Sequence, residues 1–380
     1  MQEWSWKSFF SSSDKGGPVV EMNPQGSTGA DPLPAPGIVR SLQACATASG
    51  VFTILAADHR DALRKAIDPA APKSVPDARL IEIKLDLVRQ LAEVASAVLL
   101  DPLYSAAQAI VSGTLSGQVG LLCALEEQGY LGDARGRKTT LIDGWSVELA
   151  GRLGATGVKL LFFYHPGAGA AAAAQEDLVR ALVADCRRFE IPLFLEPMSY
   201  SNDPKLEKGS PEFAALRRRI VIQSARRLGA LGPDILKVEF PLDVKHDTDQ
   251  GAWADACAEL HEASPVPWTL LSAGEPYATF QDQLRIACQA GCSGFVVGRA
   301  VWQEAVSLSG AERARSLTEV ARPRLARLRE IAEQHAAPWH TRYATPTVEP
   351  TWFRAKDSPG TRAAARPGGA SALRHGGRRI

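Results

Sequence analysis

The chain of 380 residues has almost no net charge, no long apolar run and few histidines. Its formal charge of +1 provides no overall field that would draw it to nucleic acid or to an acidic membrane. No apolar run is long enough to cross a bilayer, and no cationic N-terminal segment leads into an apolar one. We therefore expect a cytoplasmic protein without a secretory signal, and neither nucleic acid nor a membrane as a partner.

Cysteine and histidine are also too sparse or too scattered for an obvious metal site. The six cysteines form no CxxC pair, and several lie inside apolar runs, as reduced core residues of a cytoplasmic protein do. Of the seven histidines, only His59 and His165 fall near the ends of predicted strands. A catalytic metal would need clustered ligands. We expect no metal and no cofactor.

Both ends of the chain differ in composition from its middle. The beginning is rich in Ser, Gly and Pro without a hydrophobic period, and the end is mostly Ala, Gly and Arg. We expect a flexible N-terminal extension over 1–37, one folded domain over 38–350 and a flexible tail over 351–380. The arginines of the tail could contact nucleic acid, but a solvated tail is the favoured interpretation.

Between these ends, eight short apolar runs alternate with helical patterns. Runs of this kind are typical of parallel strands that are buried on both faces. Eight such units over roughly 290 residues fit an α/β fold of the TIM (β/α)8 barrel type. The alternative, a doubly wound open sheet, would need fewer strands, and no GxGxxG follows the first run. The predicted strands are 52–57, 97–101, 120–125, 157–164, 191–196, 235–240, 268–272 and 294–298.

The sixth run, 235–240, carries two charges among apolar residues. Side chains alternate along a strand, so Ile235, Lys237 and Glu239 would share one face and the other three residues the opposite face. A lysine and a glutamate inside a barrel are unfavourable unless they are paired. A buried lysine readily loses its charge, and the neutral amine attacks carbonyl carbon. The alternative is an edge strand with a solvated Lys–Glu face.

Polar residues fall at the carboxyl ends of the predicted strands, where TIM barrels carry their chemistry. Lys159, Glu196 and Lys237 lie on three consecutive strands, so their side chains can converge over the barrel. A second cation and partial desolvation both lower the pKa of an amine. One of the two lysines is therefore expected to be a nucleophile near neutral pH, and Glu196 between them can move protons.

Other strand ends have weaker individual signals. Asp58 and Asp101 end the first two predicted strands, although an aspartate before a proline is often a plain turn residue, and Asp58 could simply anchor Arg60. The segments 272–274 and 298–299 follow the last two strands, where loops of this fold commonly bind phosphate through backbone N–H groups. Glycine is also the usual way out of a strand, but a serine and an arginine beside it favour phosphate.

Nine segments together resemble one known family. They are Ala56–Arg60, Leu99–Pro102, Leu125–Tyr130, Trp145–Val147, Gly157–Lys159, Phe194–Glu196, Leu236–Glu239, Leu271–Gly274 and Gly298–Trp302. In this order they resemble the tagatose 1,6-bisphosphate aldolase family, a group of class I aldolases on a TIM barrel that also includes aldolases for sulfofructose 1-phosphate. The resemblance covers about residues 38 to 335.

The resemblance implies a site and a reaction. It implies a Schiff-base lysine at Lys237, with Asp58, Lys159 and Glu196 as the other catalytic residues. The expected substrate-binding residues are His59, Arg60, Asp101, Glu239, Ser272, Gly274, Gly298 and Arg299, and the resemblance implies that the last four form a phosphate site. Where this chain has His59 the family often has glutamine, which leaves the identity of the sugar open.

The expected function is reversible cleavage of a phosphorylated ketose, a ketose 1-phosphate similar to tagatose 1,6-bisphosphate, to dihydroxyacetone phosphate and an aldehyde. One alternative is cleavage of sulfofructose 1-phosphate, a sulfonated ketose, at the same site. Another is a barrel that senses sugar phosphates with low turnover. The aldehyde product, the stereoselectivity at C4 and a homo-oligomeric state remain open at this point.

Overall fold

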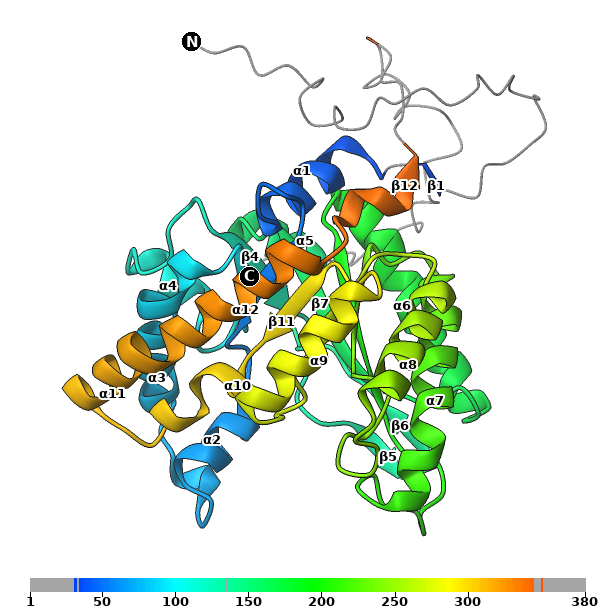
Figure 1. Cartoon of the computed structure of the whole chain (residues 1–380). Helices are drawn as coiled ribbons and strands as arrows, with labels where there is room; N and C mark the ends of the chain where they lie inside the picture. The colour runs from blue at the N-terminus through cyan, green and yellow to red at the C-terminus, as the bar shows by residue number, and fades with distance from the viewer. Residues whose placement is uncertain (1–30, 33, 134, 345–349, 351–380) are drawn as a thin grey trace, which may run out of the picture.

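The computed structural model describes residues 31–32, 34–133, 135–344 and 350. Its centre is a closed barrel of eight parallel strands in the order β10-β11-β2-β3-β4-β7-β8-β9 (Figure 1). The predicted TIM barrel is therefore confirmed, and pairing of β11 with β2 excludes an open sheet. The strands are β2 (Phe52–Ala56), β3 (Ala97–Leu100), β4 (Gly120–Ala124), β7 (Gly157–Tyr164), β8 (Leu193–Ser199), β9 (Ile235–Val238), β10 (Trp268–Leu271) and β11 (Gly294–Val297).

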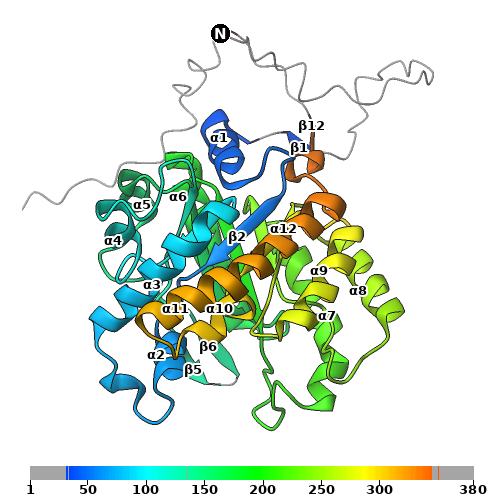
Figure 2. The same ribbon diagram turned by 60° about the vertical axis from the view of Figure 1, so that its left-hand side comes forward.

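Helices follow the strands and surround the barrel (Figure 2). Several begin at a side chain that accepts a hydrogen bond from the first turn: Ser146, Ser210 and Asp249 do so. The helices around the barrel are α2 (Asp61–Ile67), α3 (Asp77–Leu91), α4 (Ala106–Val111), α5 (Val147–Leu153), α6 (Ala170–Phe189), α7 (Pro211–Gly229), α8 (Gln250–Ala263), α9 (Tyr277–Gln289), α10 (Arg299–Trp302), α11 (Gly310–Ser316) and α12 (Arg322–His335).

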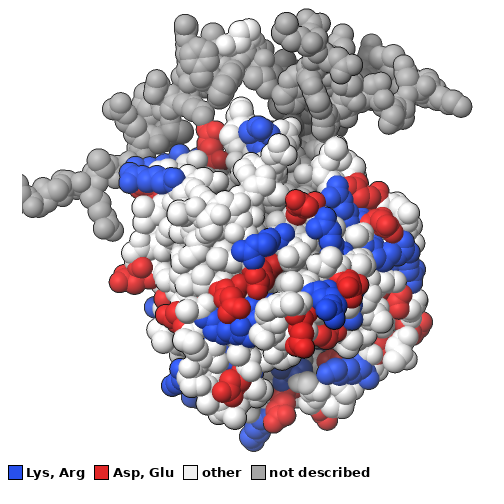
Figure 3. Space-filling view, turned by 90° about the vertical axis from the view of Figure 1, so that its left-hand side faces the viewer, with Lys and Arg blue, Asp and Glu red and all other residues white. Residues whose placement is uncertain are grey.

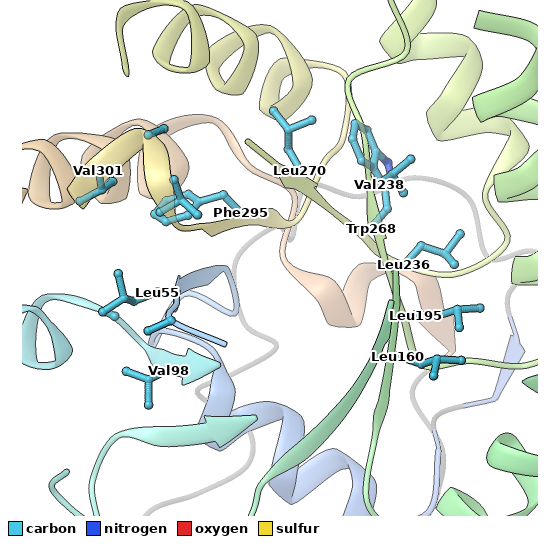
Figure 4. Packing of buried hydrophobic residues seen from close by; sticks show 14 of the residues in the cluster. Leu55, Val98, Leu160, Leu195, Leu236, Val238, Trp268, Leu270, Phe295 and Val301 are labelled. Atoms are coloured by element: carbon cyan, nitrogen blue, oxygen red, sulfur yellow. The ribbon is translucent and has the colours of Figure 1, made fainter. Parts of the chain in front are cut away.

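Alternation along the strands divides the apolar residues into two cores. Outward-facing residues pack under the helices, as Figure 4 shows for Leu55, Val98 and Leu160. Inward-facing residues, among them Ile54 and Leu99, form a smaller core inside the barrel. The prediction for 235–240 is confirmed for its apolar members, because Ile235 belongs to the inner core and Leu236, Val238 and Phe240 to the outer one.

One end of the barrel is closed by a helix that the sequence did not predict. Helix α1 (Pro36–Cys45) begins inside the segment that was expected to be a flexible extension, and proline is well suited to a first helical position. Its residues Ile38, Leu42 and Cys45 are fully buried in the inner core together with Trp339. Next to it, β1 (Asp31–Pro32) pairs with β12 (Tyr343–Ala344). Because α1 packs against the first residues of the strands, it covers their amino ends.

The other end of the barrel carries the carboxyl ends of the strands and a small hairpin. Strands β5 (Leu131–Asp133) and β6 (Gly136–Lys138) follow β4 and lie at the end opposite α1 (Figure 1). The remaining parts of the predicted extension and tail, 1–30 and 351–380, lie outside the described residues. The carboxyl ends of the barrel strands therefore face the side of the hairpin.

The surface shows no single sign of charge on the face seen in Figure 3. Basic and acidic side chains are interspersed there. Ion pairs also form along single helices, such as that of Arg89 with Asp86 on α3. Among the described residues, no helix combines the length and apolar character needed to cross a membrane.

Candidate active site

The side chains of four predicted residues meet inside the barrel: Lys159, Glu196 and Lys237 lie on β7, β8 and β9, and Asp58 lies two residues after β2. The Lys159 Nζ atom lies 2.7 Å from Asp58 Oδ2 and 3.3 Å from Glu196 Oε2. The Lys237 Nζ atom lies 2.8 Å from the same Glu196 Oε2. The expected convergence of the two lysines on Glu196 is thus present, and all four residues form one connected row.

A fifth member of this row, Glu126, was not among the predicted site residues. Its Oε1 lies 2.6 Å from Lys159 Nζ, and its Oε2 accepts a hydrogen bond of 3.0 Å from the Leu161 backbone N–H. Leu122 of β4 faces the barrel interior, and Glu126 stands four residues further on, with the same parity. The period-two pattern of this strand could therefore have identified it.

The charges in this row are strongly coupled. Lys159 is buried, which alone would lower its pKa, but the carboxylates of Asp58, Glu126 and Glu196 raise that pKa well above its ordinary value. Burial opposes ionisation of Asp58, yet the Lys159 ammonium lowers the pKa of Asp58 far below its usual range. Burial raises the pKa of Glu126 despite Lys159, and the carboxylate of Asp58 adds to that rise. Lys159 is therefore held as an ammonium ion.

His59 lies beside Asp58 and is packed in a fixed orientation. Its Nδ1 is 3.8 Å from Asp58 Oδ1, and its ring meets the Trp302 ring edge to face at 5.3 Å. Gly298 leaves room for the ring, because a Cβ at that position would lie 2.8 Å from the imidazole Cε1 and 3.1 Å from the Ala56 carbonyl oxygen. Burial, with Arg299 and Lys237 nearby, lowers the pKa of His59 to about 3, so the ring is neutral at physiological pH. Its buried Nδ1 makes no hydrogen bond within the described structure.

The segments after β10 and β11 form a second feature at the same rim. Ala273 and Gly274 have positive φ angles of 49° and 85°. A non-glycine residue such as Ala273 rarely adopts this conformation, and residues that do so cluster at binding and active sites. The half-buried Arg299 guanidinium packs against Gly274, where an added Cβ would lie 3.2 Å from Cζ. Ser272, Gly274, Gly298 and Arg299 are thus brought together as predicted.

A family model described as "DeoC/LacD family aldolase" matches residues 52–304, which include every strand of the barrel. The chain belongs to this aldolase family. It is accordingly a lyase with a TIM barrel, and its charged row lies where barrels of this kind carry their chemistry.

Curated relatives of this chain are named for one activity. A protein of Streptococcus pyogenes named tagatose 1,6-diphosphate aldolase 2 is 29% identical over 310 residues, covering 76% of this chain and 93% of the relative. A Staphylococcus aureus protein named tagatose 1,6-diphosphate aldolase is 29% identical over 285 residues, covering 71% of this chain and 86% of the relative.

Solved structures share the fold of this aldolase. A fructose-bisphosphate aldolase from Slackia heliotrinireducens has a TM-score of 0.53 at 16% identity, covering 78% of this chain and 90% of the other. An archaeal fructose-1,6-bisphosphate aldolase, solved with its catalytic lysine covalently bound to the carbinolamine intermediate of its substrate, has a TM-score of 0.50 at 19% identity. It covers 78% of this chain and 99% of the other.

Two residues predicted to bind substrate are engaged elsewhere in this aldolase. Asp101 is fully buried and forms an ion pair with Lys84 of α3, while its Oδ1 accepts backbone N–H groups from Leu103 and Tyr104. Lys84 also donates to the Ala57 carbonyl at 2.8 Å. These contacts tie α3 to the ends of β2 and β3, and they describe a structural role for Asp101.

Glu239 also faces away from the two lysines of the row. Its Oε2 accepts the Ser199 backbone N–H at 2.6 Å, and its Oε1 lies 2.7 Å from Lys208 Nζ and 3.9 Å from Arg217. Although burial opposes ionisation, these two cations lower the pKa of Glu239. These contacts of Glu239 hold the segment between β8 and α7 in place.

Arg60 contacts the charged row through the backbone of Glu126. It is buried and donates a 2.6 Å hydrogen bond to the Glu126 carbonyl, with Glu127 at 3.7 Å. Among the described residues, no cluster of three or more histidine, cysteine, aspartate or glutamate side chains could hold a metal ion.

Proposed function

We propose that this protein is a class I aldolase that cleaves a ketose 1-phosphate through a Schiff base on Lys237. The single observation that carries the proposal is the different pairing of the two lysines around Glu196. Lys159 faces three carboxylates, whereas Lys237 has only the Glu196 carboxylate within 4 Å among the described residues. A nucleophilic amine has to give up its proton, which the surroundings of Lys159 oppose.

The reaction follows from this assignment. Glu196, 2.8 Å away, accepts a proton from Lys237, and the free amine adds to the C2 carbonyl to give a carbinolamine. Loss of water gives an iminium ion. A carboxylate base then removes the proton of the C4 hydroxyl, the C3–C4 bond breaks, and its electrons flow into the iminium to form an enamine.

The second half of the reaction releases the two products. The aldehyde leaves, the enamine takes a proton at C3, and water hydrolyses the resulting iminium to dihydroxyacetone phosphate and free Lys237. Glu196 is the group in contact with both lysines, so we assign it these proton transfers. Lys159 stays charged and, with Asp58, orients the substrate hydroxyls by hydrogen bonds.

The phosphate on C1 is assigned to the rim after β10 and β11. The turn at Ala273 and Gly274 presents successive backbone N–H groups, an arrangement that favours anions. Among the described residues, the half-buried Arg299 guanidinium has no hydrogen-bonding partner and is free to form a bidentate contact. The neutral His59 has an open Nδ1 that can hydrogen-bond to a substrate hydroxyl.

The names of the relatives favour tagatose 1,6-bisphosphate as the substrate. Sulfofructose 1-phosphate is the alternative: it has the opposite configuration at C4 and carries a sulfonate at C6 in place of the phosphate. Turnover assays with tagatose and fructose 1,6-bisphosphates and with sulfofructose 1-phosphate decide between them.

Borohydride trapping tests the proposal. Incubation with dihydroxyacetone phosphate and borohydride should add covalent mass to the peptide that holds Lys237, and Lys237→Met should abolish this adduct. The matched control, Lys159→Met, should leave the adduct on Lys237. An adduct on Lys159 would contradict the assignment, and an adduct without measurable turnover of any ketose phosphate would instead indicate a sugar-phosphate sensor.

A further inference from the structure

Arg137, on strand β6 of the hairpin, is enclosed by aromatic rings. Its guanidinium carbon lies 4.4 Å from the ring centre of Tyr130, 4.9 Å from that of Phe163 and 4.6 Å from that of Tyr200. Tyr130 follows β4, Phe163 is on β7, and Tyr200 comes directly after β8. Cation–π contacts between Arg137 and these three rings therefore hold the hairpin against the rim of the barrel.

This cation has no carboxylate partner in the described part of the chain. The Nε atom is buried and makes no hydrogen bond there, and the guanidinium forms no ion pair with a described residue. The buried Arg313 differs, because its guanidinium forms ion pairs with Glu82 and Asp86. Ring faces attract the charge but offer none of the in-plane acceptors that five N–H donors require. An oxyanion supplies such acceptors in a matching fork geometry.

Arg137 and Arg299 lie on opposite sides of the barrel mouth. In the closed strand order, β11, which precedes Arg299, is four strands away from β7, which carries Phe163. Phe163 shares the inward face of β7 with Lys159 and stands four residues beyond it, or about 13 Å along the strand. The charged row thus lies between two guanidinium groups, neither of which has a described carboxylate within 4 Å.

We propose that Arg137 binds the anionic group at the end of the ketose that is remote from the C1 phosphate. Arg137 thereby selects substrates that carry a charge at both ends. This inference rests on the proposed function, because it assumes that C1 lies toward Arg299 and that C2 reaches Lys237. A phosphate and a sulfonate at C6 present the same oxyanion chemistry to a guanidinium, so both are included.

Steady-state kinetics on three substrates test the role of Arg137. They are a ketose 1-phosphate with a free C6 hydroxyl, the corresponding 1,6-bisphosphate, and the 6-deoxy-6-sulfo ketose 1-phosphate. Arg137→Met should raise KM for a doubly charged substrate roughly 10- to 100-fold, as expected for a lost charge-assisted contact. It should change kcat/KM for the singly charged substrate by about threefold at most. Arg137→Lys should restore part of the selectivity.

Lys138→Met is the matched control, because Lys138 is an exposed cation on the same strand. It should leave all three substrates unaffected, and melting temperatures should show that each variant is folded. A rise in KM that is confined to one or both doubly charged substrates supports the proposal and identifies which C6 anion Arg137 binds. An equal fall in kcat/KM for all three substrates, or no change, overturns the proposal. Arg137 would then have only a structural role in holding the hairpin, and the proposed function would stand. If the wild-type protein cleaves none of them, both proposals are wrong.

Discussion

Replacing Lys159 with methionine tests the electrostatic account of the charged row. The substitution keeps much of the side-chain volume but removes the ammonium that lies 2.7 Å from Asp58 and 2.6 Å from Glu126. Glu196 loses the Lys159 ammonium at 3.3 Å but keeps the closer Lys237 ammonium at 2.8 Å. Asp58 and Glu126 are therefore the two carboxylates that lose their main charged partner.

The expected loss of stability is large. Removing one partner of a buried ion pair typically destabilises a protein by about 3–5 kcal/mol, because an uncompensated charge stays buried. The side chains of Asp58 and Glu126 are only 11% and 7% exposed, so solvent can do little to replace the ammonium. Lys237→Met is the control: it leaves Glu196 beside Lys159, and we expect about 1–3 kcal/mol.

The loss should depend on pH with a definite sign. In the wild-type protein the folded-state pKa of Asp58 lies below its unfolded value, so its stabilising contribution is present above about pH 4 and is lost only in stronger acid. In the variant, buried carboxylates without Lys159 have raised folded-state pKa values. Such groups stabilise below the unfolded pKa and lose this contribution as the pH rises through the folded pKa. The gap in unfolding free energy between wild type and variant should therefore widen from pH 5 to pH 8.

Urea unfolding of both proteins at several pH values between 5 and 8 measures this gap. A difference below about 1 kcal/mol at pH 8, as is usual for exposed ion pairs, would refute the picture of a buried charged row. A large difference in unfolding free energy that stays constant with pH would refute the changes in pKa assigned to Asp58 and Glu126.

Three further predictions concern the C1 phosphate, metals and the chain ends. Arg299→Ala should raise KM for a phosphorylated ketose roughly 10- to 100-fold with little effect on an unphosphorylated analogue, and equal losses would indicate a structural role. Exhaustive chelation should leave turnover unchanged, and a loss that zinc restores would contradict a Schiff-base mechanism. A chain of residues 31–344 should keep its melting temperature, whereas one that begins at residue 46 should lose several degrees because Ile38 and Leu42 no longer close the barrel. Equal melting temperatures for the two would show that α1 contributes nothing.

The barrel could be predicted because each strand is short, apolar and bounded by turn residues. The row of Asp58, Lys159, Glu196 and Lys237 could be predicted as well, because each residue keeps the inward parity of its own strand. Helix α1 was missed because it begins in a segment rich in proline and glycine, which dominated the interpretation of 1–37.

Arg137 could not have been found from local pattern. Its neighbourhood consists of Tyr130, Phe163 and Tyr200, which lie on three different units of the barrel. A cation held by aromatic faces leaves no complementary charge in the sequence, so nothing near residue 137 marks it. Only the folding of the hairpin over the rim brings these residues together.

Glu239 shows where the period-two argument ends. It has the same parity as Lys237, but β9 ends at Val238, so the alternation that directs Lys237 inward no longer constrains the next charged residue. Beyond the strand, the side chain turns toward the strongest local partners, which are the Ser199 N–H and the Lys208 ammonium. Asp101, one residue beyond β3, turns in the same way toward Lys84. Inside a strand, parity therefore predicts which charged side chains point into the barrel. Past the end of a strand it does so only where a buried cation pairs with the carboxylate, as Lys159 does with Asp58 and Glu126.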